Sequence, residues 1–163
     1  MNLRPVNNAD WTTIRQWLAR PDIQRWWGPS AATEAEVIAV LGTDLAIARM
    51  IQVNGVDVGY GHAADASLWG NDLPDDLPPG TWDLDIFIAA QGYRGKGIGP
   101  SALALLREEV FATTLAVSVS VFPSIENEQA VRAYEKIGFR WKRIWDDPVH
   151  GPSWFMVYDR PLP

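Results

Sequence analysis

A short segment in the middle of the chain, GYRGKGIGP at residues 92–100, restricts the possible folds more than any other. Four of its nine residues are glycine and the last is proline, and an apolar run begins at Ala102. Glycine loses more backbone freedom on folding than other residues, so this cluster is costly unless the backbone needs unusual angles or a close approach. An alternating stretch, TWDLDIFIA, precedes it. We therefore predict a strand, a glycine-rich turn and a helix, in that order.

The glycine spacing indicates what this turn could bind. Gly95, Gly97 and Gly99 alternate just before the predicted helix, which offers backbone N–H groups and the positive end of a helix dipole to an anion. The Rossmann and P-loop motifs do not fit, because the former needs G-x-G-x-x-G and the latter needs Gly-Lys-Ser/Thr. A tight turn without a ligand explains the glycines alone equally well.

The rest of the chain predicts one mixed α/β domain over residues 1–163, with no repeat and no linker. Asn54-Gly55 between two apolar stretches predicts a hairpin, and Thr33 with Glu36 has the spacing of a helix capping box. The segment RWWG and residues 64–80 are expected to be irregular. The expected helices and strands are, in chain order, a strand at 3–6, helices at 8–19 and 33–41, strands at 45–53, 56–63 and 81–89, a helix at 100–111, a strand at 115–121, a helix at 125–137, and strands at 139–145 and 153–159.

Composition excludes several classes of protein. The chain has no cysteine, which rules out disulfides, thiolate metal sites and cysteine nucleophiles, and the separate His62 and His150 lack metal-ligand spacing. No metal is expected. The net charge of −6 disfavours nucleic acid and favours a cationic partner. The absence of a membrane-length apolar run and of a signal-peptide core leads us to expect a cytoplasmic protein without a membrane partner, either a monomer or a homodimer.

An acidic, tryptophan-rich region precedes the glycine segment. Between residues 65 and 85 the chain has no lysine or arginine but has six aspartates, at positions 65, 72, 75, 76, 83 and 85. Asp83 and Asp85 alternate on one predicted strand and therefore share a face, where they repel unless a cation lies between them. A solvated acidic loop is the simpler alternative. We expect a polycation site, with Trp69 and Trp82 packing on the rings of the ligand and Asp72 contributing charge; Asp146 and Asp147, in a late turn, are expected to be solvated.

Two motifs together resemble those of the GNAT superfamily of N-acetyltransferases. RGKGIG at 94–99 matches the R/Q-x-x-G-x-G/A pyrophosphate loop, and NEQAVRAYEKIGF at 127–139 resembles the closing motif of that superfamily. The order of elements agrees over nearly the whole chain. The resemblance implies a mixed, mostly antiparallel central sheet of about seven strands flanked by about four helices. It also implies acetyl-CoA as donor, bound by Arg94, Gly95, Lys96, Gly97, Ile98 and Gly99, with its pantetheine arm beside Ile88 and Ala89.

Within the superfamily the chain resembles the aminoglycoside 6′-N-acetyltransferases. The similarity lies in RPDIQRWWG at 20–28, in WDLDIFIA at 82–89 and in the closing motif. It implies that Asp85 lies at the position of a family aspartate and that Trp26 or Trp27 contacts the sugar rings. The chain differs at Phe122, where some members carry an aspartate, so one substrate-binding carboxylate is expected to be missing and the range of drugs acetylated to differ.

Amide formation from an ammonium and a thioester requires a base, a group that stabilises the oxyanion and an acid for the leaving thiolate. Asp85 is our candidate base for the acceptor ammonium, directly or through water, although it could serve only as an anchor. An N–H at Ile88 or Ala89 could stabilise the oxyanion, and Tyr134 could protonate the leaving thiolate or simply pack in the core. Asn127 could bind the pantetheine amides or cap its helix. His62 is expected either in the acceptor pocket or in the core.

Three functions are compatible with the sequence. The favoured one is acetylation of an aminoglycoside amine, which would confer antibiotic resistance. The second is the same transfer to another amine, such as a siderophore precursor, a polyamine or a protein N-terminus. The third is an acetyl-CoA-binding module without catalysis, which the combination of the loop with Asp85 and Tyr134 disfavours.

Overall fold

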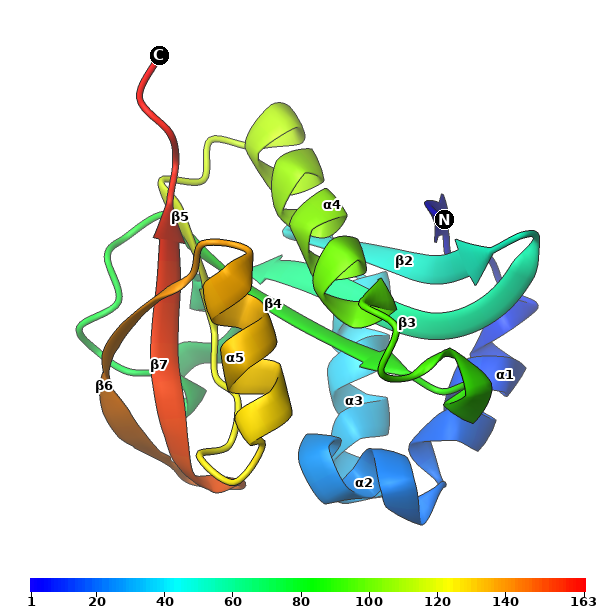
Figure 1. Ribbon diagram of the computed structural model, residues 1–163. Helices are drawn as coiled ribbons and strands as arrows, with labels where there is room; N and C mark the ends of the chain where they lie inside the picture. The colour runs from blue at the N-terminus through cyan, green and yellow to red at the C-terminus, as the bar shows by residue number, and fades with distance from the viewer.

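Alternating apolar residues build one seven-stranded sheet at the centre of the computed structural model, which describes residues 1–163 (Figure 1). The strand order is β1-β2-β3-β4-β5-β7-β6, and every neighbouring pair is antiparallel except β4 with β5. This confirms the mixed, mostly antiparallel sheet expected from the sequence. The strands are β1 (Asn2–Pro5), β2 (Ala46–Val53), β3 (Val56–Asp65), β4 (Thr81–Ile88), β5 (Ser118–Val121), β6 (Arg140–Asp147) and β7 (Gly151–Asp159).

Five α-helices and two short 3-10 helices connect the strands. The extra helix relative to the expected four is α2, which includes three residues of the RWWG segment expected to be irregular. Pro21 occupies its first turn, where the missing N–H costs no hydrogen bond. None of the helices is long and apolar enough to cross a bilayer. The helices are α1 (Asp10–Leu18), α2 (Pro21–Trp27), α3 (Ser30–Leu41), η1 (Ala66–Asp72), η2 (Gln91–Tyr93), α4 (Ile98–Thr113) and α5 (Glu128–Lys136).

Helix α3 starts earlier than the sequence indicated. It begins at Ser30, and the Thr33 hydroxyl donates to the carbonyls of Pro29 and Ser30 from within the first turn. The predicted capping box is therefore wrong, and Glu36 lies in the middle of the helix. The predicted Asn54-Gly55 turn is present, because both residues have the positive φ, 50° and 79°, that a two-residue hairpin requires.

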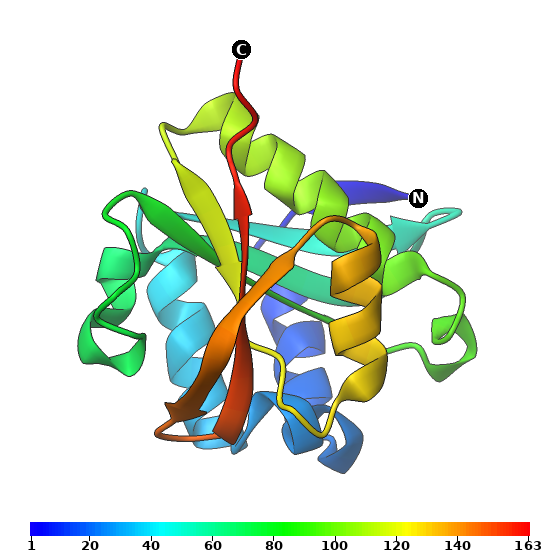
Figure 2. The ribbon, with the colours of Figure 1, turned by 60° about the vertical axis from the view of Figure 1, so that its left-hand side comes forward.

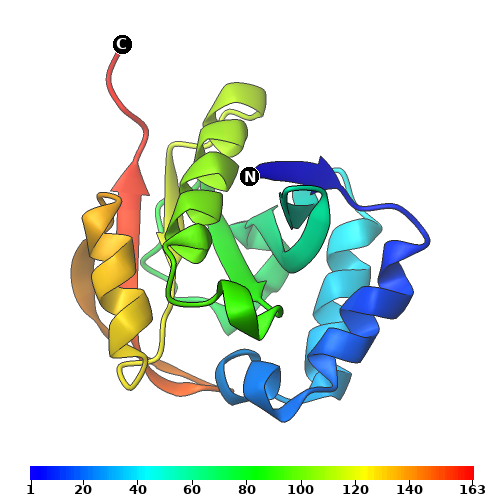
Figure 3. The same cartoon turned by 45° about the vertical axis from the view of Figure 1, so that its right-hand side comes forward.

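The sheet carries a hydrophobic core on each face. Helices α4 and α5 cover one face, and α1, α2 and α3 cover the other (Figures 1 and 3). The alternation of β4 divides its side chains between them: Leu84 and Ile86 pack under α4, whereas Phe87 packs against α1 and α2. Asp83 and Asp85 alternate with Leu84 and therefore lie on the same face as Phe87, as the sequence predicted.

Strand β4 pairs with β5 over only three residues, Thr81–Asp83 with Ser118–Ser120, and then continues to Ile88 without that neighbour. The last hairpin, β6–β7, extends along the other side of the opening so created. Its turn lies beside α2, far away in sequence (Figure 2). The opening between β4 and β5 is where the two halves of the chain meet.

Gly138 combines a left-handed backbone with a close neighbour, so it should tolerate a side chain poorly. It follows α5 with φ of 102°, and a Cβ there would lie 2.8 Å from the ring of Tyr158. We expect Gly138→Ala to lower the free energy of unfolding by about 2–4 kcal/mol, through left-handed strain and overpacking together. Urea denaturation measures this change.

Gly55→Ala is the matched control for Gly138→Ala. Gly55 also has positive φ, but a Cβ there meets nothing within 4 Å. We expect only the conformational cost, about 1–2 kcal/mol. Equal losses in the two variants would show that contact with Tyr158 is unimportant.

Candidate active site

Two adjoining cavities flank the part of β4 that has left β5. The first has a volume of about 430 Å³ and the second of about 960 Å³. They adjoin because the same side chains line both of them. The shared residues are Trp26, Trp27, Ile86, Asn127, Ala130 and Tyr134.

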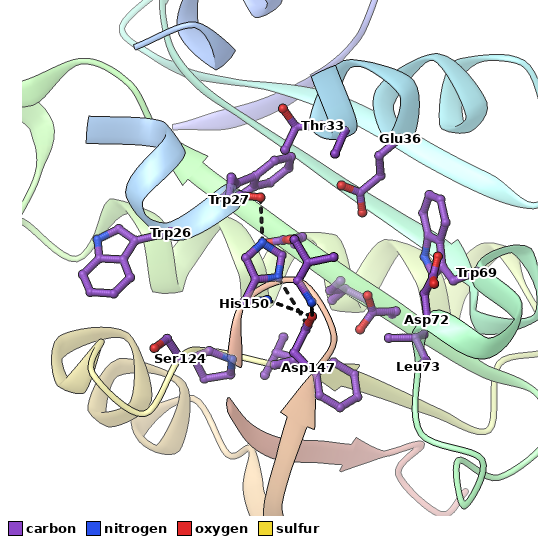
Figure 4. A pocket seen from close by; sticks show the side chains of 18 of the residues that line it. Trp26, Trp27, Thr33, Glu36, Trp69, Asp72, Leu73, Ser124, Asp147 and His150 are labelled. Carbon is purple, nitrogen blue, oxygen red and sulfur yellow. Dashed lines mark hydrogen bonds and ion pairs between the residues drawn. The ribbon is translucent and has the colours of Figure 1, made fainter. Parts of the chain in front are cut away.

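Carboxylates from separate parts of the fold converge on the first cavity (Figure 4). Asp83 and Asp85 come from β4, Glu36 from α3, Asp72 from the end of η1 and Asp147 from the end of β6. His150 is the only side chain lining this cavity that can carry a positive charge. The cavity is therefore strongly acidic, as expected for a site that receives a cation.

Burial raises the pKa values of the deepest carboxyl groups. The pKa of Glu36 rises to about 7 and that of Asp83 to about 8, and the pKa of Asp85 lies well above its usual range; in each case burial is the main cause and nearby carboxylates add to it. The Ser120 hydroxyl donates to Asp83 at 2.9 Å, which offsets part of the effect. These groups hold protons near neutral pH unless a cation compensates them.

The glycine segment forms the wall of the second cavity. Gly95 and Gly97 have φ values of 73° and 76°, and Gly97 directly precedes α4. A Cβ on either glycine would meet nothing within 4 Å, so this side of the loop is open. Gly99 and Ile98 also line the cavity, whereas Lys96 does not. Open backbone at the start of a long helix suits an anion.

Arg94 connects this loop to the acceptor side of the molecule. Its Nε donates to the carbonyl of Ile88 at 2.8 Å, and its Nη2 lies 2.9 Å from Asp22 of α2. Arg94 lines the second cavity, as the sequence predicted, but its side chain already makes hydrogen bonds within the protein. It therefore also acts as a structural tie between the loop, β4 and α2.

Tyr134 and Asn127 lie where the cavities meet. Burial, with a smaller contribution from Asp85, raises the pKa of the Tyr134 hydroxyl above its usual range, so it keeps its proton. Asn127 caps α5, with its Oδ1 accepting from the N–H of Ala130 at 3.4 Å, and it also lines both cavities. Both of the roles that the sequence left open for Asn127 are thus geometrically possible.

The two backbone amides proposed for an oxyanion are not equivalent. The N–H of Ala89 donates to the carbonyl of Val58 at 2.8 Å, and Ala89 is buried outside both cavity walls, so this part of the prediction is wrong. Ile88 pairs with Gly59 next to that bond. Because ladder bonds alternate along an antiparallel pair, the N–H of Ile88 points away from β3, toward the opening.

The four tryptophans that the sequence analysis assigned to the acceptor lie in different environments. Trp26 and Trp69 line the first cavity. Trp27 lines it with only its edge, because it is 6% exposed and its Nε1 donates to the carbonyl of Ile86 at 3.1 Å. Trp82 is not at the site: alternation along β4 turns it to the opposite face from Asp83, into the core beneath α4.

The structure also places the histidines and the remaining acidic residues, and it overturns the expectation for Asp147. Asp147 is not solvated but lines the first cavity, and His150, which had no assigned role, lies beside it. His62 is core: it is 2% exposed and bonds the Tyr60 hydroxyl at 2.9 Å. Asp75 and Asp76 lie outside the cavity, and Asp76 pairs with Arg143 at 2.8 Å.

Sequence reasoning missed Glu36, Asp147 and His150. Glu36 was assigned to a cap, although its separation from Thr33 and Val40 places it on one helix face with them. The other two residues occupy a turn whose position opposite α2 has no local signal. Phe122, at the position of the expected missing carboxylate, lines the cavity and packs on Trp145 and Phe155. No group of three or more His, Asp or Glu side chains is placed to hold a metal ion.

Comparisons with known proteins agree with this geometry. A family model described as an acetyltransferase (GNAT) domain matches residues 7–146. An aminoglycoside N(6′)-acetyltransferase type 1 of Klebsiella pneumoniae is 28% identical over 168 aligned residues, covering 98% of this chain and 83% of that protein. A kanamycin resistance protein of Rhizobium radiobacter is 31% identical over 53% of this chain and 79% of its own length.

Solved structures give the same result. The crystal structure of aminoglycoside acetyltransferase AAC(6′)-Ib in complex with coenzyme A and kanamycin superposes with a TM-score of 0.84 at 28% identity, covering 98% of this chain and 94% of that one. A spermidine N-acetyltransferase of Vibrio cholerae superposes with a TM-score of 0.76 at 15% identity, over 97% of this chain and 94% of that one, which shows the fold alone.

The raised pKa of Asp83 predicts a pH-dependent stability. Between pH ~4 and pH 8 the folded protein keeps a proton that the unfolded chain has released, so this group lowers stability as pH rises through that window. Asp83→Asn removes the titration and keeps an oxygen for Ser120. We expect the variant to be more stable than the wild type by about 1–2 kcal/mol at pH 8, with the difference vanishing toward pH 4.

Thermal unfolding between pH 4 and pH 9 measures the Asp83→Asn effect. Asp76→Asn is the control, because the pKa of Asp76 is lowered by its bond to Arg143, and the substitution should not stabilise at high pH. If Asp83→Asn and the wild type have the same stability at every pH, the pKa of Asp83 is not raised.

Proposed function

The chain belongs to the GNAT acetyltransferase family, and we propose that it transfers the acetyl group of acetyl-CoA to a primary amine of an aminoglycoside, at the 6′ position. The observation that carries this proposal is the pair of adjoining cavities, one walled by open glycine backbone and one by carboxylates. The similarity to aminoglycoside 6′-N-acetyltransferases over 98% of the chain supports the choice of acceptor.

The second cavity fits acetyl-CoA. The loop from Gly95 to Gly99 offers backbone N–H groups at the start of α4 to the diphosphate, and the open positions of Gly95 and Gly97 allow close approach. The free edge of β4 at Ile88 would receive the pantetheine arm like an added strand. Bound there, acetyl-CoA supplies an acyl thioester that an amine can attack.

The first cavity fits a cationic, ring-bearing acceptor. Its carboxylates supply the compensating charge for several ammonium groups, and Trp26 and Trp69 offer flat apolar faces to the rings. A linear polyamine would use the carboxylates but not the ring-sized faces. The pKa values of Glu36 and Asp83, near 7 and 8, also imply that acceptor binding releases protons.

Residues at the junction of the two cavities and on either side of it supply the chemistry. Asp85 removes the proton from the acceptor ammonium, and its raised pKa makes it a stronger base than a solvated aspartate. The N–H of Ile88 stabilises the negative charge that develops on the carbonyl oxygen. Tyr134, kept protonated by burial, gives its proton to the departing sulfur. We place the reaction in the cytoplasm, where acetyl-CoA is available.

Asp85→Asn tests the acceptor side. The amide keeps the shape of the carboxylate but cannot take a proton, so we expect kcat on kanamycin and tobramycin to fall by about 10²-fold or more. Thiol release from acetyl-CoA measures turnover, with spermidine and a neutral hydroxyalkylamine as further acceptors. The wild type should prefer the aminoglycosides.

Asp75→Asn is the matched control for Asp85→Asn. It makes the same change of charge in an exposed residue of the same acidic segment, outside both cavities. We expect its kcat to stay within about 2-fold of the wild type, as for surface substitutions in general. Wild-type turnover by the Asp85 variant between pH 6 and pH 9 would exclude that residue as base and as anchor.

Tyr134→Phe tests the acid. Removal of the hydroxyl should lower kcat by about 10- to 100-fold and leave the KM for acetyl-CoA within a few fold, because the lost interaction is made only in the transition state. Single-turnover measurements separate chemistry from product release. A folded variant with unchanged single-turnover rate would assign Tyr134 to packing.

A further inference from the structure

The turn between β6 and β7 is shaped around one carboxylate and presents one histidine to the first cavity. Asp147 Oδ1 accepts from the backbone N–H groups of Val149, at 2.8 Å, and His150, at 3.1 Å. Its other oxygen lies 3.3 Å from Nδ1 of the His150 ring. Because both oxygens of Asp147 are used within the turn, this carboxylate serves mainly to hold the His150 ring in place.

The opposite side of the ring contacts the N-terminal half of the protein (Figure 4). His150 Nε2 lies 2.7 Å from the carbonyl oxygen of Trp27, the last residue of α2. Gly28 makes this approach possible: its φ is 98°, and a Cβ there would lie 3.0 Å from Nε2. Only one ion pair, between Arg143 and Asp76, joins the last hairpin to residues 1–80.

These contacts require a charged ring. Both ring nitrogens face oxygen acceptors, and a neutral imidazole has only one N–H to donate, so both contacts are favourable only for the imidazolium. The carboxylates of Asp147, Asp85, Asp83, Glu36 and Asp72, from β6, β4, α3 and η1, line the same cavity as the ring. The bond to Asp147, opposed by burial and assisted by the bond to Trp27, raises the pKa of His150 to about 9.

We propose that His150 is a positioning residue for the acceptor: as an imidazolium it clamps the β6–β7 turn to the end of α2 and so fixes the width of the acceptor cavity. We call His150, the Asp147 carboxylate and the Trp27 carbonyl the His150 clamp. The inference rests on the proposed function, since it concerns the acceptor cavity. The cavity that we assign to acetyl-CoA contains neither Asp147 nor His150.

The clamp makes a specific kinetic prediction. His150→Gln removes the charge and should raise the KM for an aminoglycoside by about 10-fold, as expected for loss of a charge-assisted hydrogen bond. The KM for acetyl-CoA should stay within about 2-fold, and kcat within about 3-fold. Gly28→Ala, which displaces the ring from Trp27 without altering His150, should reproduce this pattern, and exposed Gly55→Ala is its control.

The pH dependence has a defined sign. A histidine with a raised pKa contributes its contact fully below its unfolded value and loses it as pH rises through the folded value. The ratio of acceptor KM between His150→Gln and the wild type should therefore be about 10 at pH 7.5 and fall toward one above pH 9. Taking the ratio cancels the titration of the acceptor's own amines.

Nitrogen-15 NMR of the two histidines tests the clamp without any acceptor. His150→Gln identifies its resonances, since the chain has only one other histidine, His62, whose pKa burial lowers to about 3. We expect His150 to be doubly protonated at pH 7.5 and to titrate near pH 9. Titration near its ordinary value would overturn the clamp, as would a fall in kcat with unchanged acceptor KM in His150→Gln.

The two hypotheses can fail separately. If the wild type acetylates no aminoglycoside but His150 titrates near pH 9 and Gly28→Ala lowers that pKa, the proposed function is wrong and the clamp stands. If aminoglycosides are acetylated while both variants keep the wild-type acceptor KM, the clamp is wrong and the function stands.

Discussion

The separation of β4 from β5 is the constraint on which the rest of the site depends. Three residues pair, and then β4 continues alone to Ile88. A strand edge inside a protein leaves backbone N–H and C=O groups without ladder partners, and these need other partners. Trp27 and Arg94 supply donors to the carbonyls of Ile86 and Ile88. The edge that remains open separates the two cavities and faces both.

The buried carboxyl groups of the acceptor cavity lower the stability of the fold when no cation is bound. Asp83, Asp85 and Glu36 all have raised pKa values because burial disfavours their charge. A protein optimised for stability would replace such groups with apolar ones. Their presence is consistent with a cationic acceptor that compensates their charge. The raised pKa of Asp85 also suits the base role that we propose for it. The same carboxyl groups that lower the free energy of unfolding therefore strengthen the binding of a cation.

Helix α2 links the two cavities. Its first turn carries Asp22, which pairs with Arg94 of the glycine segment, and its last turn carries Trp26 and Trp27 on the acceptor wall. The carbonyl of Trp27 receives His150 from the last hairpin. A displacement of this helix would therefore change the glycine segment, the wall of the first cavity and the β6–β7 turn together. No local pattern predicts α2 strongly, because Pro21 also ends helices.

The sequence by itself determined the strand–glycine–helix unit, the hairpin at Asn54-Gly55, the common face of Asp83 and Asp85 and the family resemblance of the two motifs. All of these depend on local backbone geometry or on the two-residue period of a strand, which adjacent residues encode. The two-residue period also shows why Trp82 was wrongly assigned to the acceptor site. Trp82 is adjacent to Asp83 in the strand and must therefore lie on the opposite face of the sheet.

Only the tertiary structure decided which distant residues complete the site. Glu36, Asp147 and His150 come from a helix and a turn whose positions depend on packing across the sheet. Trp27 and His150 are 123 positions apart in the sequence, and nothing local signals their contact. The same holds for Ala89, whose N–H is taken by Val58 of the neighbouring strand. Hydrogen-bond partners and burial, and hence pKa values, are properties of the assembled fold, because they depend on groups that meet only when the chain has folded.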